Sequence, residues 1–448
     1  MPLVDNPLHC LHEQAEASFL PYGPLLQIVE SYGAPEAEYA ALRKGAALMD
    51  APHRGVVELQ GRDRLAFLQN LLTNDTRALA AGEGCYAYLL NAKGRIVLDA
   101  NVLHLPERTL LEVDARRAEE LSRLLETYRF SEAVRICNRS EQLGRLSLIG
   151  PRSAALLQTV ADEPLEGLSK PFAVSTCRFA EVEAVLFRQD WCGEEQYELI
   201  VPRDGLVTLW QHFLASGEWG GGETGASTPR HAETKTEGGN KIACTALQSG
   251  EPARAAAQGR TYAEAGRHDD AKARRPGEPE PKTGNQKLKT DPSQPERGFG
   301  LRGIGWLAFN IARIEAGTPI LDIDITAQNL PLETAHWYSR AVHPNKGCYL
   351  GQEVVARMHV RRTAVRMLVG LRLPAGAAPP LAGAELRQGA EQVGIVTSSC
   401  LSPMLGNVPI ALGYLKTEFA AAGRSVLVYN RQGETMAVVT ALPHWKRS

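Results

Sequence analysis

The residues Lys346-Gly347-Cys348-Tyr349-Leu350-Gly351-Gln352-Glu353 form the most distinctive segment of this 448-residue sequence. Glycine adopts backbone conformations that other residues avoid, so Gly347 and Gly351 predict a tight loop that carries Cys348. The cation of Lys346 and a helix opening at the end of the segment would both favour the thiolate form of the cysteine. The segment therefore predicts a reactive thiol. The residue types alone also allow a small buried thiol in a glycine turn.

Short apolar runs follow this segment toward the C-terminus. Met367 to Leu371, Ile410 to Leu415 and Met436 to Leu442 are among five or six runs separated by Gly, Pro, Asn and Ser clusters. No helical pattern lies between them, which is typical of a small antiparallel β-barrel. We place the start of this barrel near residue 363.

The residues before the segment mix helical and strand patterns. Leu121, Leu124, Leu125 and Tyr128 recur at helical spacing, whereas Val182 to Phe187 and Tyr197 to Val201 indicate a hairpin around a glycine-bearing turn. Helices that punctuate strands in this way predict an α+β fold.

A polar stretch interrupts the globular pattern. Tyr262 is the only aromatic residue between Gly220 and Gly298, and such a composition cannot bury enough apolar surface to offset its chain entropy. We expect a disordered polar insertion at 218–299 between regions 1–217 and 300–362, with the barrel at 363–448. A G-x-G-x-x-G pattern at 298–303 follows this charged linker instead of a strand, which does not favour a dinucleotide site.

Charge and cysteine usage exclude several classes of protein. The 49 basic and 51 acidic residues nearly cancel, so no global field favours nucleic acid, and we expect the basic run of Arg357, Arg361, Arg362 and Arg366 to be solvated or paired. The eight cysteines form no Cys-x-x-Cys pair, and the histidine spacings match no common zinc pattern, so we predict no resident metal. No apolar run approaches the roughly 20 residues that span a membrane, so we expect a cytoplasmic protein.

Two polar segments could bind a planar ligand. Residues 91–99 predict a glycine turn leading into a strand that ends in the carboxylate of Asp99, and residues 188–198 place Trp191 beside several carboxylates. An aromatic face and an acceptor carboxylate suit an aminopyrimidine ring, because a carboxylate can accept two N–H bonds. Hairpin turns are polar in any case, so a purely structural role stays open.

Motifs along most of the chain resemble a known family. The chain resembles the folate-binding YgfZ-type iron–sulfur cluster assembly proteins, which are relatives of the aminomethyltransferase (T-protein) of glycine cleavage. The resemblance runs through Tyr39 to Arg43, Gly61 to Arg64, Phe67 to Asp75 and Arg313 to Gly317. The loop from Lys346 to Glu353 looks like the signature that separates YgfZ-type members from true aminomethyltransferases.

The resemblance implies a three-part fold around a central site for tetrahydrofolate or a derivative. We expect Cys348, Lys346 and Tyr349 to be the catalytic residues, on a signature loop that also contains Gly347, Gly351, Gln352 and Glu353. The residues that the resemblance places around the folate are Asp99, Asp114, Arg188, Trp191, Glu194, Glu198 and Arg313.

The resemblance also implies a function. We expect a tetrahydrofolate-binding factor that assembles or repairs [4Fe–4S] clusters on client enzymes, including tRNA-modifying ones. Aminomethyltransferases carry paired aspartates after the glycine turn, whereas Leu98 fills one of these positions here and Asp99 the other. A folate-dependent aminomethyl or one-carbon transferase that uses Asp99 is the alternative from the enzyme class, and a noncatalytic scaffold is the third.

Overall fold

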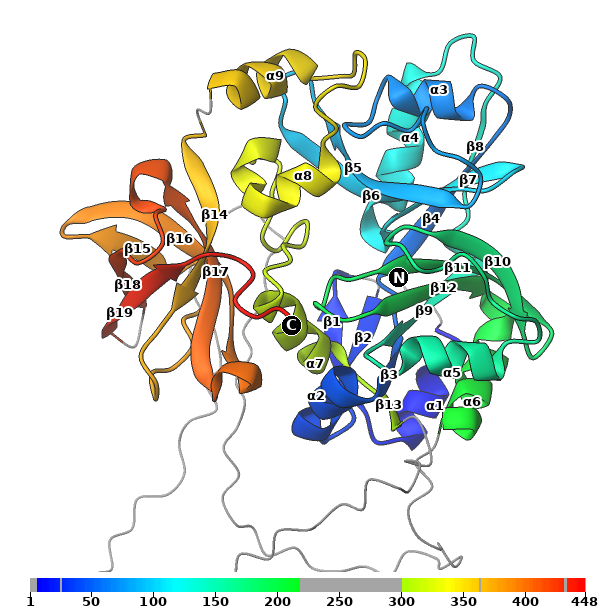
Figure 1. Ribbon diagram of the computed structural model, residues 1–448, viewed down its shortest axis with the longest axis horizontal. Coiled ribbons are helices and arrows are strands. Elements are labelled where there is room, and N and C mark those ends of the chain that lie inside the picture. The colour runs from blue at the N-terminus through cyan, green and yellow to red at the C-terminus, as the bar shows by residue number, and fades with distance from the viewer. Residues whose placement is uncertain (1–5, 25, 218–299, 362–363, 431–432, 448) are drawn as a thin grey trace, which may run out of the picture. The chain divides into compact units, whose positions relative to one another are not determined.

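The computed structural model describes residues 6–24, 26–217, 300–361, 364–430 and 433–447 (Figure 1). The insertion predicted at 218–299 lies outside the described residues. The α+β architecture is confirmed, because the described chain forms two larger sheets, a small hairpin, several helices and a C-terminal barrel.

A five-stranded antiparallel sheet contributes one wall of the central region. Its strands run in the order β5 (Glu83–Leu90), β6 (Ile96–His104), β7 (Arg108–Asp114), β4 (Arg54–Gln60) and β8 (Arg135–Asn138). Successive side chains of a strand point to opposite faces. One face buries Val57, Leu98 and Leu111 in the main core, and the opposite face carries the polar residues of β6 and β7. Asp99 lies within β6, so the expectation that the strand ends at this carboxylate is wrong.

A six-stranded sheet contributes the second wall. Its order is β10 (Val174–Phe179), β11 (Val182–Gln189), β12 (Gln196–Pro202), β9 (Leu143–Ile149), β3 (Ala46–Asp50) and β13 (Leu301–Gly303). The hairpin predicted from the sequence is β11 with β12. β13 pairs in parallel with β3, so residues 301–303 form a strand and not a phosphate-binding loop. Leu146, Leu148 and Leu199 bury one face in a second core with helical side chains.

Helices cover or connect these sheets. The helix predicted from Leu121 to Tyr128 is confirmed as α4 (Ala118–Tyr128). None of the helices in the described ranges is both long and apolar enough to cross a membrane. The remaining elements outside the barrel are α1 (His9–Gln14), β1 (Ser18–Tyr22), β2 (Leu26–Ser31), α2 (Pro35–Lys44), α3 (Arg64–Gln69), η1 (Ala115–Arg117), α5 (Ser153–Val160), η2 (Arg203–Gly205), α6 (Leu206–Gly217), α7 (Trp306–Glu315), η3 (Pro331–Trp337), α8 (Tyr338–Ala341) and α9 (Gln352–Arg361).

The C-terminal strands close into a six-stranded antiparallel barrel, drawn from yellow to red in Figure 1. Closure occurs because β14 pairs with both β17 and β19, so the predicted barrel is confirmed. Residues 362–363 lie outside the described ranges, and the division of the chain into domains stays a prediction. The barrel elements are β14 (Arg366–Arg372), β15 (Glu385–Gln388), β16 (Glu391–Ser402), η4 (Pro403–Leu405), β17 (Val408–Lys416), η5 (Thr417–Phe419), β18 (Ser425–Asn430) and β19 (Gly433–Thr440).

Arg313 of α7 joins its helix to the barrel. Its guanidinium pairs with Asp324 at 2.5 Å and donates to the Ser398 hydroxyl of β16 at 2.7 Å, and both charged side chains are fully buried. Asp324 also accepts hydrogen bonds from Ser398 and Thr397. A buried charge is tolerated only when it is paired, so this cluster determines how α7 meets the barrel wall.

Lys346 anchors the cysteine-bearing loop to the end of α3. Its ammonium donates to the backbone carbonyls of Gln69 (2.6 Å), Asn74 (3.0 Å) and Leu72. Burial lowers the pKa of Lys346 to about 8. This value is still above 7, so the side chain stays mainly an ammonium with three donors near pH 7. Cys348 projects from the anchored loop and is exposed.

Gly351 allows the other end of this loop to pack closely against the glycine turn before β6. It has φ +80°, and a Cβ atom there would lie 2.6 Å from the carbonyl oxygen of Asn91. A side chain at this position would therefore clash with the turn. The three motifs around residues 70–75, 91–95 and 346–353 thus meet in space.

We predict that Arg313→Met lowers the free energy of unfolding by about 3–5 kcal/mol, because Asp324 would remain buried without its cation. Urea unfolding would measure the loss. Adding Asp324→Asn to the same chain should recover part of it, because the double variant leaves no unpaired charge. A loss below about 1 kcal/mol in the single variant would contradict the role of the pair.

We predict that Lys346→Met lowers the free energy of unfolding by about 2–4 kcal/mol, because three backbone carbonyls lose their donor. Cys348→Ser, two residues further on, should stay within about 0.5 kcal/mol of the wild type because the thiol is exposed. Denaturant titration of both variants makes the comparison. Equal stabilities of the two variants would mean that the lysine does not anchor the loop.

Candidate functional site

The polar faces of the two larger sheets are joined by a buried ionic network. Arg145 of β9 reaches Glu198 of β12 at 2.6 Å and also pairs with Glu112 of β7. Glu112 in turn binds Arg54 of β4 at 2.5 Å and accepts from Asn101 of β6 at 2.6 Å. The network contains two arginines and two glutamates in alternation, so its charges cancel. All four side chains are almost completely buried.

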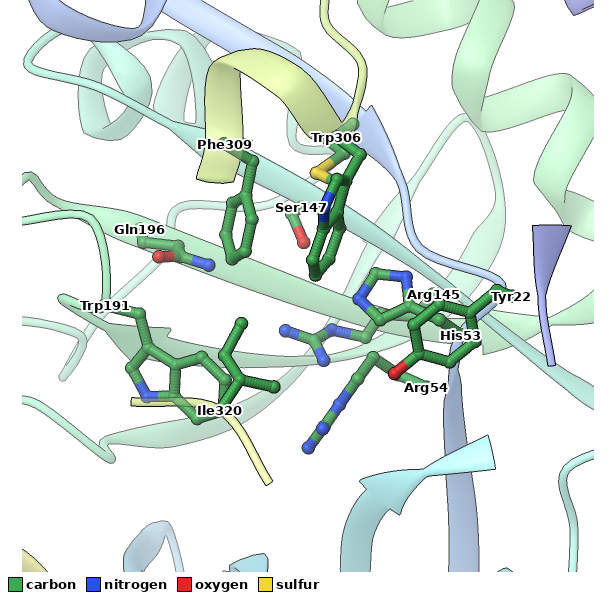
Figure 2. A pocket seen from close by; sticks show the side chains of 11 residues that line it. Tyr22, His53, Arg54, Arg145, Ser147, Trp191, Gln196, Trp306, Phe309 and Ile320 are labelled. Atoms are coloured by element: carbon green, nitrogen blue, oxygen red, sulfur yellow. The ribbon is translucent and has the colours of Figure 1, made fainter. Parts of the chain in front are cut away.

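A cavity opens beside this network. Figure 2 shows Trp191 on one side of Arg145 and the rings of His53 and Tyr22 on the other in this view. β9 and β12 position the lining residues from one wall, and α7 contributes two aromatic rings. The cavity is lined by Tyr22, Met49, His53, Arg54, Arg145, Ser147, Trp191, Gln196, Trp306, Phe309 and Ile320.

Several buried polar atoms at or near this cavity have no hydrogen-bond partner in the described part of the chain. They include donors such as the indole nitrogens of Trp191 and Trp306, and acceptors such as Gln196 Oε1, Asn101 Oδ1 and Asp99 Oδ1. Buried polar atoms in folded proteins are nearly always hydrogen-bonded. A ligand that presents both donors and acceptors, or ordered water, would complete these bonds.

Asp99 is the carboxylate best suited to proton chemistry. Its Oδ2 accepts a 2.7 Å hydrogen bond from the Tyr86 hydroxyl, whereas Oδ1 has no partner. Burial raises the pKa of the Asp99 carboxyl above its ordinary value, against the opposing charge of Arg54. Tyr86 packs edge-on against Trp191, with 6.2 Å between ring centroids, and so connects Asp99 to the cavity wall.

His53 contributes a neutral ring to the cavity. Burial, together with the charges of Arg54 and Arg145, lowers the pKa of His53 to about 3. Near pH 7 the imidazole therefore carries one proton and offers one donor and one acceptor. Its Nδ1 has no hydrogen-bond partner in the described ranges.

Among the residues predicted to contact folate, Trp191 lines the cavity. Asp99 does not line it and is connected to it through Tyr86, whose ring contacts Trp191. Glu198 lies behind the lining residues that it binds. The Glu198 carboxylate accepts from Arg145 and from the Ser147 hydroxyl at 2.5 Å, and also from the Gln196 amide. Ser147 and Gln196 both line the cavity. The geometry therefore makes Glu198 a support for the lining residues, and its direct contact with a ligand stays a prediction.

Asp114 is already engaged by the protein. Arg116 binds both of its carboxylate oxygens, at 3.0 and 2.8 Å, and the Tyr22 hydroxyl donates to Oδ2. Burial alone would raise the pKa of Asp114, but the bonds from Arg116 hold it below its ordinary value. Asp114 thus positions Tyr22, which lines the cavity.

Three further predicted residues do not line the cavity. Arg313 joins α7 to the barrel, Glu194 pairs with Arg43 and Arg447, and Arg188 reaches the Ser169 carbonyl and Glu195. Their contact with a ligand stays a prediction. The residues of the 346–353 loop do not line the cavity either. Gln352 accepts from the backbone N–H of Tyr349 at 3.3 Å, and Glu353 is exposed in the first turn of α9.

Most of the lining residues were not predicted from the sequence. His53, Arg54, Arg145, Ser147 and Gln196 were not singled out. A usable signal was present, because Arg145 and Ser147 alternate with Leu146 and Leu148 in one strand. Polar residues at every second position of an otherwise apolar strand indicate a buried polar face.

No site for a metal is found among the described residues, since they contain no group of three or more His, Cys, Asp or Glu side chains that could hold an ion.

Known families match both ends of the chain. The GCVT N-terminal domain matches residues 8–232, and the glycine cleavage T-protein C-terminal barrel domain matches residues 366–446. The crystal structure of glycine cleavage system aminomethyltransferase T from Bartonella henselae has a TM-score of 0.72 with this chain. It is 20% identical and covers 100% of this chain and 98% of its own. This likeness confirms the T-protein-like fold.

Curated relatives match over the full length. The aminomethyltransferase of Halalkalibacterium halodurans is 25% identical over 99% of both chains. That of Caldanaerobacter subterraneus subsp. tengcongensis is 22% identical over 100% of this chain and 97% of its own. These findings contradict the predicted role in iron–sulfur cluster assembly, because relatives that match the chain from end to end are named aminomethyltransferases. The expected iron–sulfur clients lose their support with it.

The matches favour the transferase alternative over the main expectation. The N-terminal family model alone covers half of the chain, and the barrel model accounts for the C-terminal strands. Most strands of the two larger sheets lie within the first match, and the barrel strands lie within the second. This chain is a member of the glycine cleavage T-protein (GCVT) family.

Proposed function

We propose that this protein is a folate-dependent one-carbon transferase of the aminomethyltransferase type. The observation that carries the proposal is Asp99, a buried carboxylate with one oxygen held by Tyr86 and the other without a partner in the described chain. Tyr86 in turn contacts Trp191, which lines the aromatic cavity. A buried acid with a raised pKa next to a cavity is the arrangement expected for proton transfer. The full-length relatives named aminomethyltransferase support the same reaction class.

The residues around the cavity suit tetrahydrofolate, which aminomethyltransferases of this family use. A pterin ring is flat and carries several donors and acceptors, and the cavity offers the indole N–H of Trp191 and the Gln196 carbonyl oxygen without partners. The ionic network beside the cavity is neutral, so it favours an uncharged heterocycle over a bound anion.

The chemistry divides between the ligand and the chain. Tetrahydrofolate, when bound, supplies the amine nitrogen that accepts the one-carbon unit. Asp99 holds or accepts a proton at Oδ1, and Tyr86 keeps the carboxylate oriented through Oδ2. The raised pKa of Asp99 brings its proton affinity closer to neutral pH, where transfer in either direction is efficient. Asp99 is only 4% exposed, so bulk water has little access to this carboxylate.

The absence of a paired aspartate does not remove the reactive group. Leu98 is buried in the main core on the apolar face of the sheet, whereas Asp99 points to the polar face that carries Asn101 and Glu112. Only one of two adjacent strand residues can face the cavity side. Asp99 therefore retains the position from which a carboxylate can act.

Several finer assignments remain part of the proposal. The Lys346 to Glu353 loop is the basis for placing the chain in the YgfZ-type branch of the family. We keep that placement as a proposal about ancestry and draw no function from it. Direct reaction at Cys348 or Tyr349, and folate contacts of Glu198, Arg188 and the other assigned residues, rest on the resemblance. A cytoplasmic location and the proposed domain boundaries, which were drawn from composition and apolar patterning, stay predictions.

The decisive experiment combines binding with turnover. Calorimetric titration with tetrahydrofolate should give saturable binding. Ammonia release from an aminomethyl donor should then require tetrahydrofolate. We predict that Asp99→Asn keeps folate affinity within a few-fold and lowers turnover by about 100-fold or more, because the amide cannot exchange the proton.

A matched control is Asp162→Asn, at an exposed turn after α5, which should leave turnover unchanged. Absence of folate-dependent ammonia release by the wild type would overturn the transferase proposal. Full turnover by Asp99→Asn would instead show that another group moves the proton.

The raised pKa of Asp99 also predicts a pH-dependent difference in stability. A carboxyl whose folded-state pKa exceeds the unfolded value of about 3.9 contributes stability at low pH that is lost as pH rises through the folded pKa. The Asp99→Asn side chain does not ionise, so the variant does not lose stability in this way. We therefore expect the melting temperature of the variant, minus that of the wild type, to increase between pH 4 and pH 8. Differential scanning calorimetry at several pH values tests this, and a constant or falling difference would contradict it.

A further inference from the structure

The C-terminal segment crosses the turn that carries Trp191. We call residues 443–447 the C-terminal strap. The backbone N–H of Trp445 donates to the Glu315 carbonyl at the end of α7 at 2.9 Å. Its indole ring stacks on the Arg43 guanidinium of α2, 4.3 Å from the ring centroid. The strap is therefore held by two helices before it reaches the turn.

The strap meets the turn at Gly193 and Glu194. A Cβ atom at Gly193 would lie 3.7 Å from the Trp445 ring, so the indole packs directly on the turn backbone. The Arg447 guanidinium donates to Glu194 Oε2 at 2.9 Å. The Glu194 side chain is 1% exposed and that of Arg447 is 53% exposed, so the arginine closes the outer side of a buried carboxylate.

Arg43 holds the inner side of the same turn. It donates to the Cys192 carbonyl at 2.7 Å and lies 3.5 Å from Glu194 Oε1. It is itself fixed by Glu315 at 2.5 Å. Burial raises the pKa of Glu194, and the charges of Arg43 and Arg447 oppose this effect. The two arginines therefore approach the two oxygens of this carboxylate from different elements, and both favour its ionised form.

The turn carries one wall of the cavity. Trp191 lines the cavity, and its backbone carbonyl accepts from the Thr318 hydroxyl at 2.7 Å. Its ring contacts Tyr86, which orients Asp99. A displacement of the turn would move this ring, and misplacement of a cavity wall by about 1 Å can lower activity substantially.

We propose that Arg447 and Trp445 are positioning residues for the ligand cavity, because they clamp the turn at residues 190–194 and so place Trp191. The inference rests on the proposed function and extends it to the C-terminus of the chain. Glu194, assigned to folate from the resemblance, acts here as the anchor for the strap. The strap makes its contacts with Glu194 on the outer side of the turn, and Trp191 faces the cavity.

The test compares substitutions at two adjacent residues, each of which removes one positive charge. Arg447→Gln removes the partner of Glu194. Lys446→Gln removes one positive charge from the neighbouring exposed residue, for which no hydrogen bond or ion pair with another described residue is found. In calorimetric titrations with tetrahydrofolate, we expect Arg447→Gln to raise Kd about three- to tenfold and Lys446→Gln to leave it within twofold. Arg447→Lys should restore much of the affinity.

A double-variant cycle separates positioning from general stabilisation. If Arg447 acts through Glu194, the combined Arg447→Gln and Glu194→Gln chain should bind tetrahydrofolate no more weakly than Glu194→Gln alone. The melting temperatures of all variants are measured in parallel. A lower melting temperature with unchanged Kd in Arg447→Gln would overturn the inference.

The wild-type titration distinguishes failure of this inference from failure of the proposed function. Saturable binding by the wild type, with equal Kd for Arg447→Gln, overturns the inference and leaves the proposed function intact. Absence of binding by the wild type overturns the proposed function and this inference together. A higher Kd for Arg447→Gln that is absent from Lys446→Gln supports both.

Discussion

The buried alternation of Arg54, Glu112, Arg145 and Glu198 is the constraint on which the central region depends. Two sheets that present charged faces to each other can pack only if every charge meets its partner, since a single unpaired buried charge costs about 3–5 kcal/mol. The network therefore sets the register of β4, β7, β9 and β12 relative to one another. The cavity lies beside it and is lined by Arg54 and Arg145 of the network together with aromatic rings.

The same region holds the groups that the protein leaves unsatisfied. Asp99 Oδ1 and the indole nitrogen of Trp191 would each be stabilised by a partner that the described chain does not provide. Buried polar atoms of this kind lower stability and are retained at sites where a ligand completes them. Both oxygens of Glu198, by contrast, accept hydrogen bonds within the protein. Glu198 therefore supports its neighbours, whereas Asp99 has an oxygen available for proton transfer.

Two of the sequence-based assignments change meaning once their contacts are known. Lys346 was expected to favour the thiolate form of Cys348, but its ammonium donates hydrogen bonds to three backbone carbonyls near α3. Glu194 was expected at the ligand, but it lies between Arg43 and Arg447. Both residues are held by contacts within the protein, and their roles at a ligand stay predictions. A distinctive loop can thus reflect the requirements of packing, and the function first attached to it was wrong.

The sequence by itself determined the local elements: helix α4, the β11–β12 hairpin and the C-terminal barrel follow from periodicity and turn residues that act over a few positions. It also indicated Asp99 and Trp191 as ligand candidates. Only the tertiary structure decided which polar side chains share the cavity, because Arg54, Arg145 and Gln196 come from separate strands. Likewise, no local pattern pairs Arg447 with Glu194, which lie 253 positions apart. Such contacts depend on how sheets and helices pack, and strand periodicity carries no information about the partner across a cavity.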